Sequence, residues 1–418
     1  MNHERRPPLV SNYYLVATTT ELLKQLERIS QRDEAVQAWV TCHPDEKVIE
    51  AFETAPQGLL SGWTLGVKDV INTFDLPTKR GSPIYHNNRP VSDAACVAVA
   101  RKAGAVVTGK TVTTEFALFT PNITTNPHDL SRTPGGSSSG SAAAVADGQV
   151  RTAFGTQTVG SVIRPAAFCG VVGFKPTYDL VPMAGVATLS HTFDTLGWFT
   201  RDISDSTTMF KALTGAELPP PNLSGKVGRY LSHQWNAAAP ETLKVLDSAS
   251  AALETSGLEV IEVDPLPHLE PVFDAANTIL HYEIARVFAW EQTHHLDLIS
   301  DLAQKMFAKA ATISHADYLA AQRILVAARQ THQEFMATHA FDGLLTPSAP
   351  GEAPSIETTG DSIFNRVWTA LGVPAIHLPV NLGPSGLPVG VQLVGQSRSD
   401  QNLLALAAAA EKSLAAHL

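Results

Sequence analysis

Three short segments hold most of the residues whose types could carry out a reaction. They are G-V-K-D-V around Lys68, T-P-G-G-S-S-S-G-S at 133–141 and G-T-Q-T-V-G-S-V-I-R-P at 155–165. Glycine allows backbone conformations closed to other residues, and small side chains let a ligand approach exposed N–H groups. A serine in such a turn, with a lysine nearby, can act as a nucleophile without a histidine. The segments therefore indicate nucleophilic chemistry at a serine.

The same segments resemble the amidase signature family. The similarity runs through P-G-G-S-S-S-G-S-A-A-A-V-A and G-T-Q-T-V-G-S-V-I-R-P-A-A-F-C-G-V-V-G-F-K-P-T, and it is dense from about Leu65 to Gly197. It continues more weakly in L-G-V-P-A-I-H-L-P and G-L-P-V-G-V-Q-L-V-G. The chain length and the S-V-I-R-P motif are similar to those of short, malonamidase-like members.

The resemblance implies a role for each chemical group. Ser161 matches the nucleophile, Ser137 matches a bridging serine that follows a cis peptide bond, and Lys68 matches the base. No metal and no cofactor are implied. The implied oxyanion hole consists of four successive backbone N–H groups, those of Thr158, Val159, Gly160 and Ser161.

These roles are chemically coherent. A free lysine has a pKa of about 10.4 and is protonated at neutral pH, so it cannot accept a proton. Burial among apolar neighbours such as Val67 and Val70 would lower that pKa, because desolvation disfavours the ammonium. A neutral Lys68 could take a proton from Ser137, which takes one from Ser161, and water would hydrolyse the acyl-enzyme along the same relay.

Two residues depart from the family pattern, in which many members have T-D-x-G-G-S where this chain has T-Q-T-V-G-S. Gln157 removes a charge near the nucleophile. Val159 replaces a glycine in the oxyanion loop, and we expect it to narrow the pocket on one side.

Arg164, three residues after Ser161, has two alternative roles. In malonamidase-like members this arginine faces a substrate carboxylate. In related members it braces the loop through internal contacts. The sequence leaves both readings open, and the second is the more common role of such arginines.

Composition limits the class of protein. The chain has 418 residues, of which 44% are hydrophobic and 17% charged, a balance typical of a soluble globular protein. A net charge of −10 and the lack of a Lys/Arg-rich run argue against nucleic acid as a partner. The three cysteines form no C-x-x-C pair, which argues against a disulfide scaffold or a zinc site. No stretch resembles a signal peptide or a membrane span, so we expect a cytoplasmic protein. The expected partner is a small-molecule amide, and the oligomeric state stays open, with a homodimer as one alternative.

Other motifs in the chain give weaker evidence of a function. G-A-V-V-T-G-K-T at 104–111 fits the phosphate-loop pattern, but a helix precedes it and its interior is β-branched, so we expect no nucleotide binding. H-H-L-D at 294–297 lacks a second ligand pair for a metal. A Ser–His–Asp arrangement with His191 and Asp194 is disfavoured, since both lie on one short segment.

Periodicity predicts alternating strands and helices, hence an α/β fold with a large mixed sheet flanked by helices and a mainly helical insertion in the C-terminal half. The expected helices are 18–41, 93–104, 141–147, 203–214, 239–256, 362–372 and 401–417, and 271–340 is almost wholly helical. The expected strands include 62–73, 105–109, 258–263 and the start of 343–350. P-P-P-N at 219–222 is the best internal boundary. We expect one domain over 1–418, with a catalytic core at 65–200 and a variable, substrate-shaping region at 220–345.

The sequence thus predicts an amidohydrolase that splits the C–N bond of a small amide or carbamate-like substrate into an acid and ammonia or an amine. One alternative is the amidase subunit of a transamidase complex that passes ammonia to a partner. Another is a degenerate binding protein, which the three intact triad positions disfavour.

Overall fold

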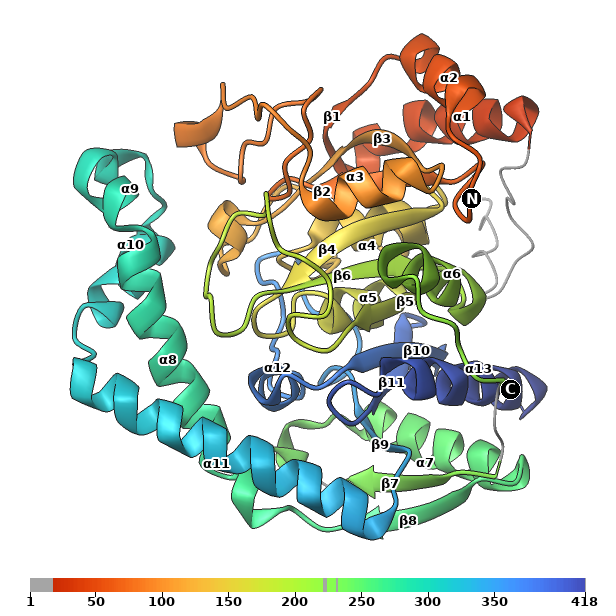
Figure 1. Cartoon of the computed structure of the whole chain (residues 1–418), viewed down its shortest axis with the longest axis vertical. Coiled ribbons are helices and arrows are strands. Elements are labelled where there is room, and N and C mark those ends of the chain that lie inside the picture. The colour runs from red at the N-terminus through yellow and green to blue at the C-terminus, as the bar shows by residue number, and fades with distance from the viewer. Residues whose placement is uncertain (1–17, 221–223, 231, 418) are drawn as a thin grey trace.

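One mixed β-sheet runs through the molecule (Figure 1). The computed structural model describes residues 18–220, 224–230 and 232–417. In this part the eleven strands follow the order β1-β3-β2-β4-β6-β5-β10-β11-β9-β7-β8. The strands are β1 (Trp39–Cys42), β2 (Thr64–Lys68), β3 (Val106–Thr111), β4 (Thr152–Gln157), β5 (Val172–Lys175), β6 (Thr195–Thr200), β7 (Lys226–Tyr230), β8 (Glu259–Val263), β9 (Gly343–Pro347), β10 (Ala375–Leu382) and β11 (Pro388–Val394).

Helices cover both faces of this sheet, and the predicted fold class is confirmed. In Figure 1, α3 and α6 lie in front of the sheet and α4 and α5 behind it. One apolar cluster joins α3, α6, α7 and α13 to the sheet, and another joins α4 and α5 to it. The α-helices are α1 (Thr19–Val36), α2 (Asp45–Thr54), α3 (Ala95–Lys102), α4 (Ser139–Ala146), α5 (Ile163–Cys169), α6 (Ile203–Thr214), α7 (Pro240–Thr255), α8 (Val272–Val287), α9 (Ala289–His294), α10 (Asp301–Ala310), α11 (His315–His339), α12 (Arg366–Leu371) and α13 (Asp400–His417).

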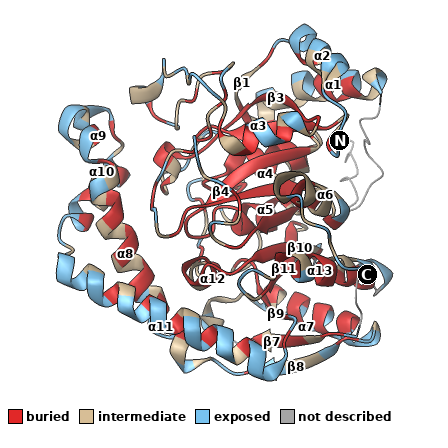
Figure 2. Ribbon diagram, in the orientation of Figure 1, coloured by how far each residue is buried: buried red, intermediate tan, exposed pale blue. Residues whose placement is uncertain are grey.

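The helices α8 to α11 form an arm along one side of the sheet, in agreement with the predicted helical insertion. Figure 2 shows the inner side of α8 buried and much of α11 exposed. A third apolar cluster lies under this arm, where Ile279 and Leu280 of α8 meet Val159 and Phe193. The arm therefore reaches the loop that the sequence assigned to the oxyanion hole.

Close strand packing at the centre of the sheet depends on glycine. β2 lies between β3 and β4 and is parallel to both, and all of its residues are buried. A Cβ on Gly155 of β4 would come within 2.8 Å of Ser138 Oγ and of the Phe199 ring. Any larger residue there would push the turn that contains Ser138 away from the sheet.

Two predicted helix boundaries are wrong. The helix expected over 18–41 ends at Val36, because Gln37 adopts a left-handed conformation (φ 53°) and closes the helix. The residues that follow, W-V-T-C, are aromatic and β-branched, and they form β1 instead. The helix expected over 362–372 begins only at Arg366.

The other expected elements stand close to their predicted positions. The strand predicted over 62–73 covers only Thr64–Lys68, so its predicted C-terminal boundary is wrong, whereas α6 covers 203–214 as expected. The boundary predicted at 219–222 lies partly outside the described residues.

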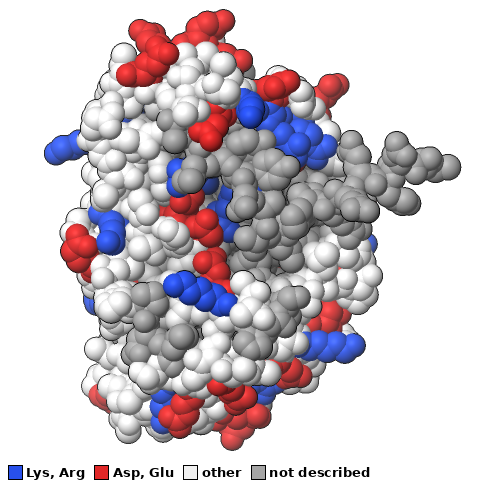
Figure 3. Space-filling model, turned by 90° about the vertical axis from the view of Figure 1, so that its right-hand side faces the viewer, with Lys and Arg blue, Asp and Glu red and all other residues white. Residues whose placement is uncertain are grey.

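On the face shown in Figure 3, acidic and basic side chains are interspersed and form no basic stripe. No helix in the described part of the chain is long and apolar enough to cross a membrane.

Candidate active site

Lys68 stands at the end of β2 with its side chain fully buried. Its Nζ donates to Ser137 Oγ at 2.7 Å and to Thr156 Oγ1 at 2.8 Å. Thr156 belongs to the neighbouring parallel strand β4, so both the position of the lysine and one of its partners come from the sheet. The structure thus brings together two residues of the expected triad and adds a threonine that the sequence analysis missed.

Ser137 lies in the glycine-rich turn before α4, and the peptide bond between Gly136 and Ser137 is cis. The Ser137 carbonyl accepts from the N–H of Thr114. Gly135 has a φ of +86°, and a Cβ there would lie 2.8 Å from the Cα of Pro165. The turn therefore packs directly against the first turn of α5, close to Ser161 in the sequence.

Ser161 lies in the loop between β4 and α5. It is the most exposed of the three expected triad residues, at 8% against 1% for Ser137 and 0% for Lys68. In the described part of the chain, Ser161 Oγ forms no hydrogen bond with Ser137 or Lys68. The structure therefore joins Lys68 to Ser137 through a hydrogen bond, whereas the proton relay and the role of Ser161 stay predictions.

Gln157 and Thr369 hold the loop that carries Ser161 through hydrogen bonds. Gln157 Oε1 accepts from the N–H groups of Val162 at 2.9 Å and Ile163 at 3.0 Å, and its Nε2 donates to Thr369 Oγ1 at 2.8 Å. Thr369 Oγ1 in turn donates to the carbonyl of Val159 at 2.9 Å. A glutamine can accept and donate at once, which an ionised carboxylate cannot, and this is how the loop tolerates the departure at 157.

Asp194 anchors the other end of the loop. Its carboxylate accepts from Thr158 Oγ1 at 2.6 Å and from the N–H groups of Leu189 and Ser190 at 2.7 and 3.0 Å. His191 points elsewhere: its ring pairs with Glu283 at 3.1 Å, and its side chain is 67% exposed. Asp194 and His191 therefore do not act as a pair.

Burial controls the electrostatics of the site. Desolvation lowers the pKa of Lys68 to about 7, with Asp194 opposing the shift and Arg164 adding to it. Burial raises the pKa of Asp194 to about 6, although the hydrogen bonds from Thr158 and two backbone amides oppose it. A large fraction of Lys68 is therefore neutral near pH 7 and able to accept a proton.

Arg164 is buried in the first turn of α5, 1% exposed. Its Nη2 donates to the carbonyl oxygen of Gly136 at 2.5 Å. Its Nε and Nη1 are buried and find no hydrogen-bond partner among the described residues. Desolvation lowers its pKa to about 10, with Asp361 opposing the shift and Arg366 adding to it.

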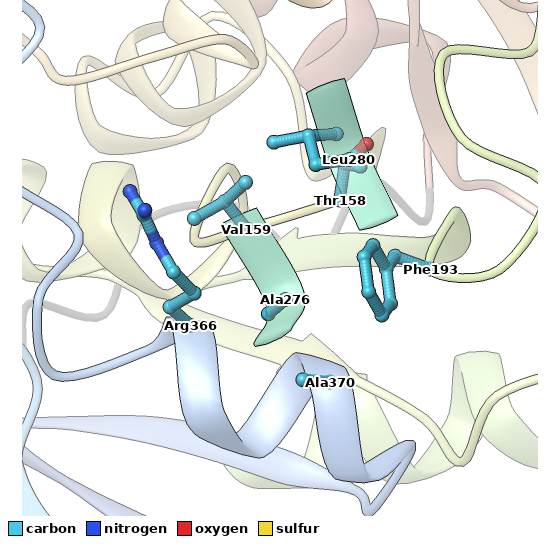
Figure 4. A pocket seen from close by; sticks show the side chains of 7 residues that line it. All are labelled: Thr158, Val159, Phe193, Ala276, Leu280, Arg366 and Ala370. Carbon is cyan, nitrogen blue, oxygen red and sulfur yellow. The ribbon is translucent and has the colours of Figure 1, made fainter. Parts of the chain in front are cut away.

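A narrow pocket opens beside the loop 158–161 (Figure 4). Its walls lie so close together that no space remains between them for a water molecule. The walls come from the loop, from the segment just before β6, and from α8 and α12. They are formed by Thr158, Val159, Phe193, Ala276, Leu280, Arg366 and Ala370. The Val159 side chain forms part of a wall, as expected.

The segment 104–111, which fits the phosphate-loop pattern, has a structural role. Residues 106–111 form β3, and Lys110 is buried. Its Nζ donates to Thr78 Oγ1 at 2.8 Å and to the Ile71 carbonyl, and it lies 3.8 Å from Asp69 Oδ1. This lysine holds the segment after Lys68 and is not available to a phosphate. Across the described residues, no group of His, Cys, Asp and Glu is arranged to hold a metal ion.

Comparison with known proteins agrees with this architecture. A model of the Amidase family matches residues 21–404, and the chain belongs to that family. It is 30% identical to a glutamyl-tRNA(Gln) amidotransferase subunit from Pseudothermotoga lettingae, over 93% of this chain and 92% of the relative.

Solved structures give the same result. An amidase crystal structure is 30% identical with a TM-score of 0.85, covering 94% of this chain and 95% of that one. The peptide amidase of Stenotrophomonas maltophilia is 27% identical with a TM-score of 0.77, covering 94% and 92%. The chain is therefore an amidase-family hydrolase or amidotransferase.

Proposed function

We propose that this protein hydrolyses the C–N bond of a small, non-peptide linear amide through Ser161, Ser137 and Lys68. The observation that carries the proposal is the buried lysine bonded to Ser137 Oγ, with a pKa lowered to about 7. A lysine in this state can act as a base at neutral pH, whereas an exposed lysine cannot.

The proposed first half-reaction forms an ester. Ser161 Oγ attacks the amide carbonyl carbon while its proton passes to Ser137 Oγ, and the proton of Ser137 passes to Lys68 Nζ. The carbonyl oxygen becomes an oxyanion. When the C–N bond breaks, the amine leaves with the proton returned along the relay, and Ser161 stays acylated. In the second half-reaction, water attacks the ester carbonyl carbon and gives a proton to the same relay. The ester C–O bond then breaks, the relay returns the proton to Ser161 Oγ, and the acid leaves.

The loop 158–161 would stabilise the oxyanion. No backbone or side-chain acceptor in the described part of the chain takes the N–H groups of Val159, Gly160 or Ser161, so these donors are free for a ligand. Gln157, Thr369 and Asp194 fix the loop without using those donors. Preorganised donors of this kind need no rearrangement as the charge develops.

Ammonia release from a panel of small amides by the purified protein tests the proposal. We expect turnover by the protein alone, and loss of turnover in the Ser161→Ala variant. A panel without any turnover, in a folded protein, would refute stand-alone hydrolysis.

The second candidate is the amidase component of a transamidase complex. Its support is the similarity to glutamyl-tRNA(Gln) amidotransferase subunits over most of both chains. If this candidate is right, amide hydrolysis by the isolated chain should be absent or weak and should rise when the other components of the complex are added.

A further inference from the structure

Glu283 of α8 carries a buried carboxylate that the proposed reaction does not use. Its side chain is 1% exposed. It lies three residues after Leu280, which forms part of the pocket wall in Figure 4. Residues three apart share one face of a helix, so the carboxylate lies on the side of α8 that meets the pocket. Burying a carboxylate is costly unless hydrogen-bond donors compensate it.

Three consecutive residues outside the arm supply most of those donors. Ser190 Oγ and Thr192 Oγ1 each donate to the Glu283 carboxylate, and the Thr192 N–H donates to it at 3.2 Å. His191 Nε2 lies 3.1 Å from one carboxylate oxygen, and the Tyr318 hydroxyl of α11 donates to the same oxygen at 3.3 Å. An ionised carboxylate has about four acceptor positions, so these contacts use nearly all of its capacity. Glu283 therefore fastens this segment to the arm.

The same segment holds the loop of the candidate site. Ser190 gives its hydroxyl to Glu283, whereas its N–H donates to the Asp194 carboxylate at 3.0 Å. The Ser190 carbonyl also accepts the N–H of Asp194 at 2.9 Å. Asp194 accepts in turn from Thr158 Oγ1 at 2.6 Å. A continuous chain of hydrogen bonds thus runs from α8 through Ser190 and Asp194 to Thr158, the first residue of the loop 158–161.

Other buried carboxylates also join the arm to the rest of the protein. Glu291 of α9 accepts from the Tyr85 hydroxyl at 2.5 Å, and Glu115 accepts from the N–H of Ser300 at 3.2 Å. Among the described residues, neither of these pairs has a hydrogen bond to the loop 158–161. Glu283 therefore differs from them, because its hydrogen bonds continue to the loop.

We propose that Glu283 is a positioning residue for the loop 158–161. By fixing Ser190, it holds Asp194 where the carboxylate keeps Thr158 in place, and so it sets the direction of the N–H groups of the loop. This inference rests on the proposed hydrolysis, in which those N–H groups bind the oxyanion. Loss of one oxyanion donor costs about 10²–10³-fold in rate, so we expect a displaced loop to cost about 10-fold.

The test measures the rate constant with which a fluorophosphonate labels Ser161, followed by mass spectrometry. Labelling forms a bond from Ser161 Oγ to phosphorus, expels fluoride and passes the serine proton to the relay. The phosphoryl oxygen takes the place of the oxyanion, so the rate constant reports on the loop without a known amide substrate. Glu283→Gln should lower it about 10-fold, because the new amide nitrogen is a donor that faces the donors Ser190 and Thr192. Ser190→Ala keeps the carboxylate, removes one of its donors and should also lower the rate constant.

Glu291→Gln is the matched control. Glu291 is 5% exposed and lies in the same arm, so the substitution removes the same charge from a comparable site. The labelling rate constant should stay unchanged, because its partner Tyr85 does not lead to the loop. A fall equal to that in Glu283→Gln would mean that loss of any buried carboxylate in the arm slows labelling, and it would overturn the proposal.

Thr158→Val provides a double-mutant cycle, because it breaks the far end of the same chain of hydrogen bonds. If Glu283 acts through Thr158, adding Glu283→Gln to Thr158→Val should change the rate constant little further. A merely structural role for Glu283 predicts that the two effects multiply, and that result would overturn the proposal. Labelling of Ser161 at the same rate with and without Glu283→Gln would refute the positioning role alone. If the unchanged protein is not labelled at Ser161, the proposed nucleophile is refuted instead, and the positioning role with it.

Discussion

Arg164 Nη2 donates to the carbonyl oxygen of Gly136, the residue that immediately precedes Ser137. The first turn of α5 is thereby tied to the turn that presents Ser137 to Lys68. The sequence left two roles open for Arg164, recognition of a substrate carboxylate and bracing of the loop. This contact supports the bracing role.

The first prediction concerns this contact. Arg164→Leu leaves the buried Gly136 carbonyl without its donor, so we expect the free energy of unfolding to fall by about 1–3 kcal/mol. Activity should fall on charged and neutral amides alike, because Ser137 is no longer held. Denaturant unfolding and kcat/KM on one amide of each kind measure the two effects. Loss of activity on charged amides alone would instead favour the recognition role.

The second prediction concerns the base. Since Lys68 must be neutral to accept a proton, kcat/KM should rise with pH through about 7, the value to which burial lowers its pKa. Below that pH the ammonium form predominates and activity is lost; above it activity levels off. Lys68→Ala should lower kcat by roughly 10²–10⁴-fold, the usual scale for general base catalysis. Lys68→Arg should not rescue it, since a guanidinium stays protonated, and an active Lys68→Arg protein would contradict the mechanism.

The third prediction identifies the nucleophile. A fluorophosphonate should label Ser161 alone among the serines, as peptide mapping by mass spectrometry can establish. Ser137→Ala should retain slight turnover because the oxyanion donors survive, whereas Ser161→Ala should retain none. An adduct on Ser137 would mean that the order of the relay is reversed.

The fourth prediction concerns the loop support. Gln157→Ala strands two buried N–H groups, those of Val162 and Ile163, so the free energy of unfolding should fall by about 2 kcal/mol or more. The rate constant kcat should fall as well, since the loop that carries Ser161 loses its anchor. Gln396→Ala is the control, because the Gln396 side chain donates to the Phe341 carbonyl, away from this loop. A Gln157→Ala protein with unchanged kcat would show that the loop does not need this support.

The fifth prediction concerns pocket width. Val159→Ala removes two methyl groups from a pocket wall, so kcat/KM for amides with branched acyl groups should rise relative to that for acetamide. Val145→Ala removes the same volume from the apolar cluster that joins α4 to the sheet, away from the loop 158–161, and should leave the ratio unchanged. Both should lower the free energy of unfolding by about 1.5 kcal/mol. An unchanged ratio in Val159→Ala would place the acyl group elsewhere.

Much of this site could be predicted from local sequence. The strand that ends at Lys68 and the turn that carries Ser137 are short motifs whose residues lie close together in the chain. The family resemblance supplied the expectation that Lys68 and Ser137 meet, which their 2.7 Å hydrogen bond confirms. The resemblance also supplied the expectation of a cis bond before Ser137.

For other residues near the site, the neighbouring sequence gave no indication of their contacts. Thr156 reads as an ordinary β-former inside a strand, and nothing in its neighbourhood says that its hydroxyl faces a lysine on the next strand. Arg366 and Thr369 lie far beyond Ser161 in the chain, and a single sequence gives no pairwise signal that would place them against its loop. Strands β4, β5 and β6 were not assigned either, because glycines interrupt their apolar runs and lower their β-propensity.

The pocket walls and the hydrogen-bond partners of Lys68 come partly from different regions of the chain. Lys68, Ser137, Thr156 and the loop to Ser161 all come from one continuous stretch of the chain, whereas Ala276 and Leu280 come from α8. Neither of the hydrogen bonds that Lys68 makes to Ser137 and Thr156 involves the arm. Helices α8 to α11 could therefore be exchanged for those of a relative, which should change the walls of the pocket and leave both hydrogen bonds of Lys68 in place.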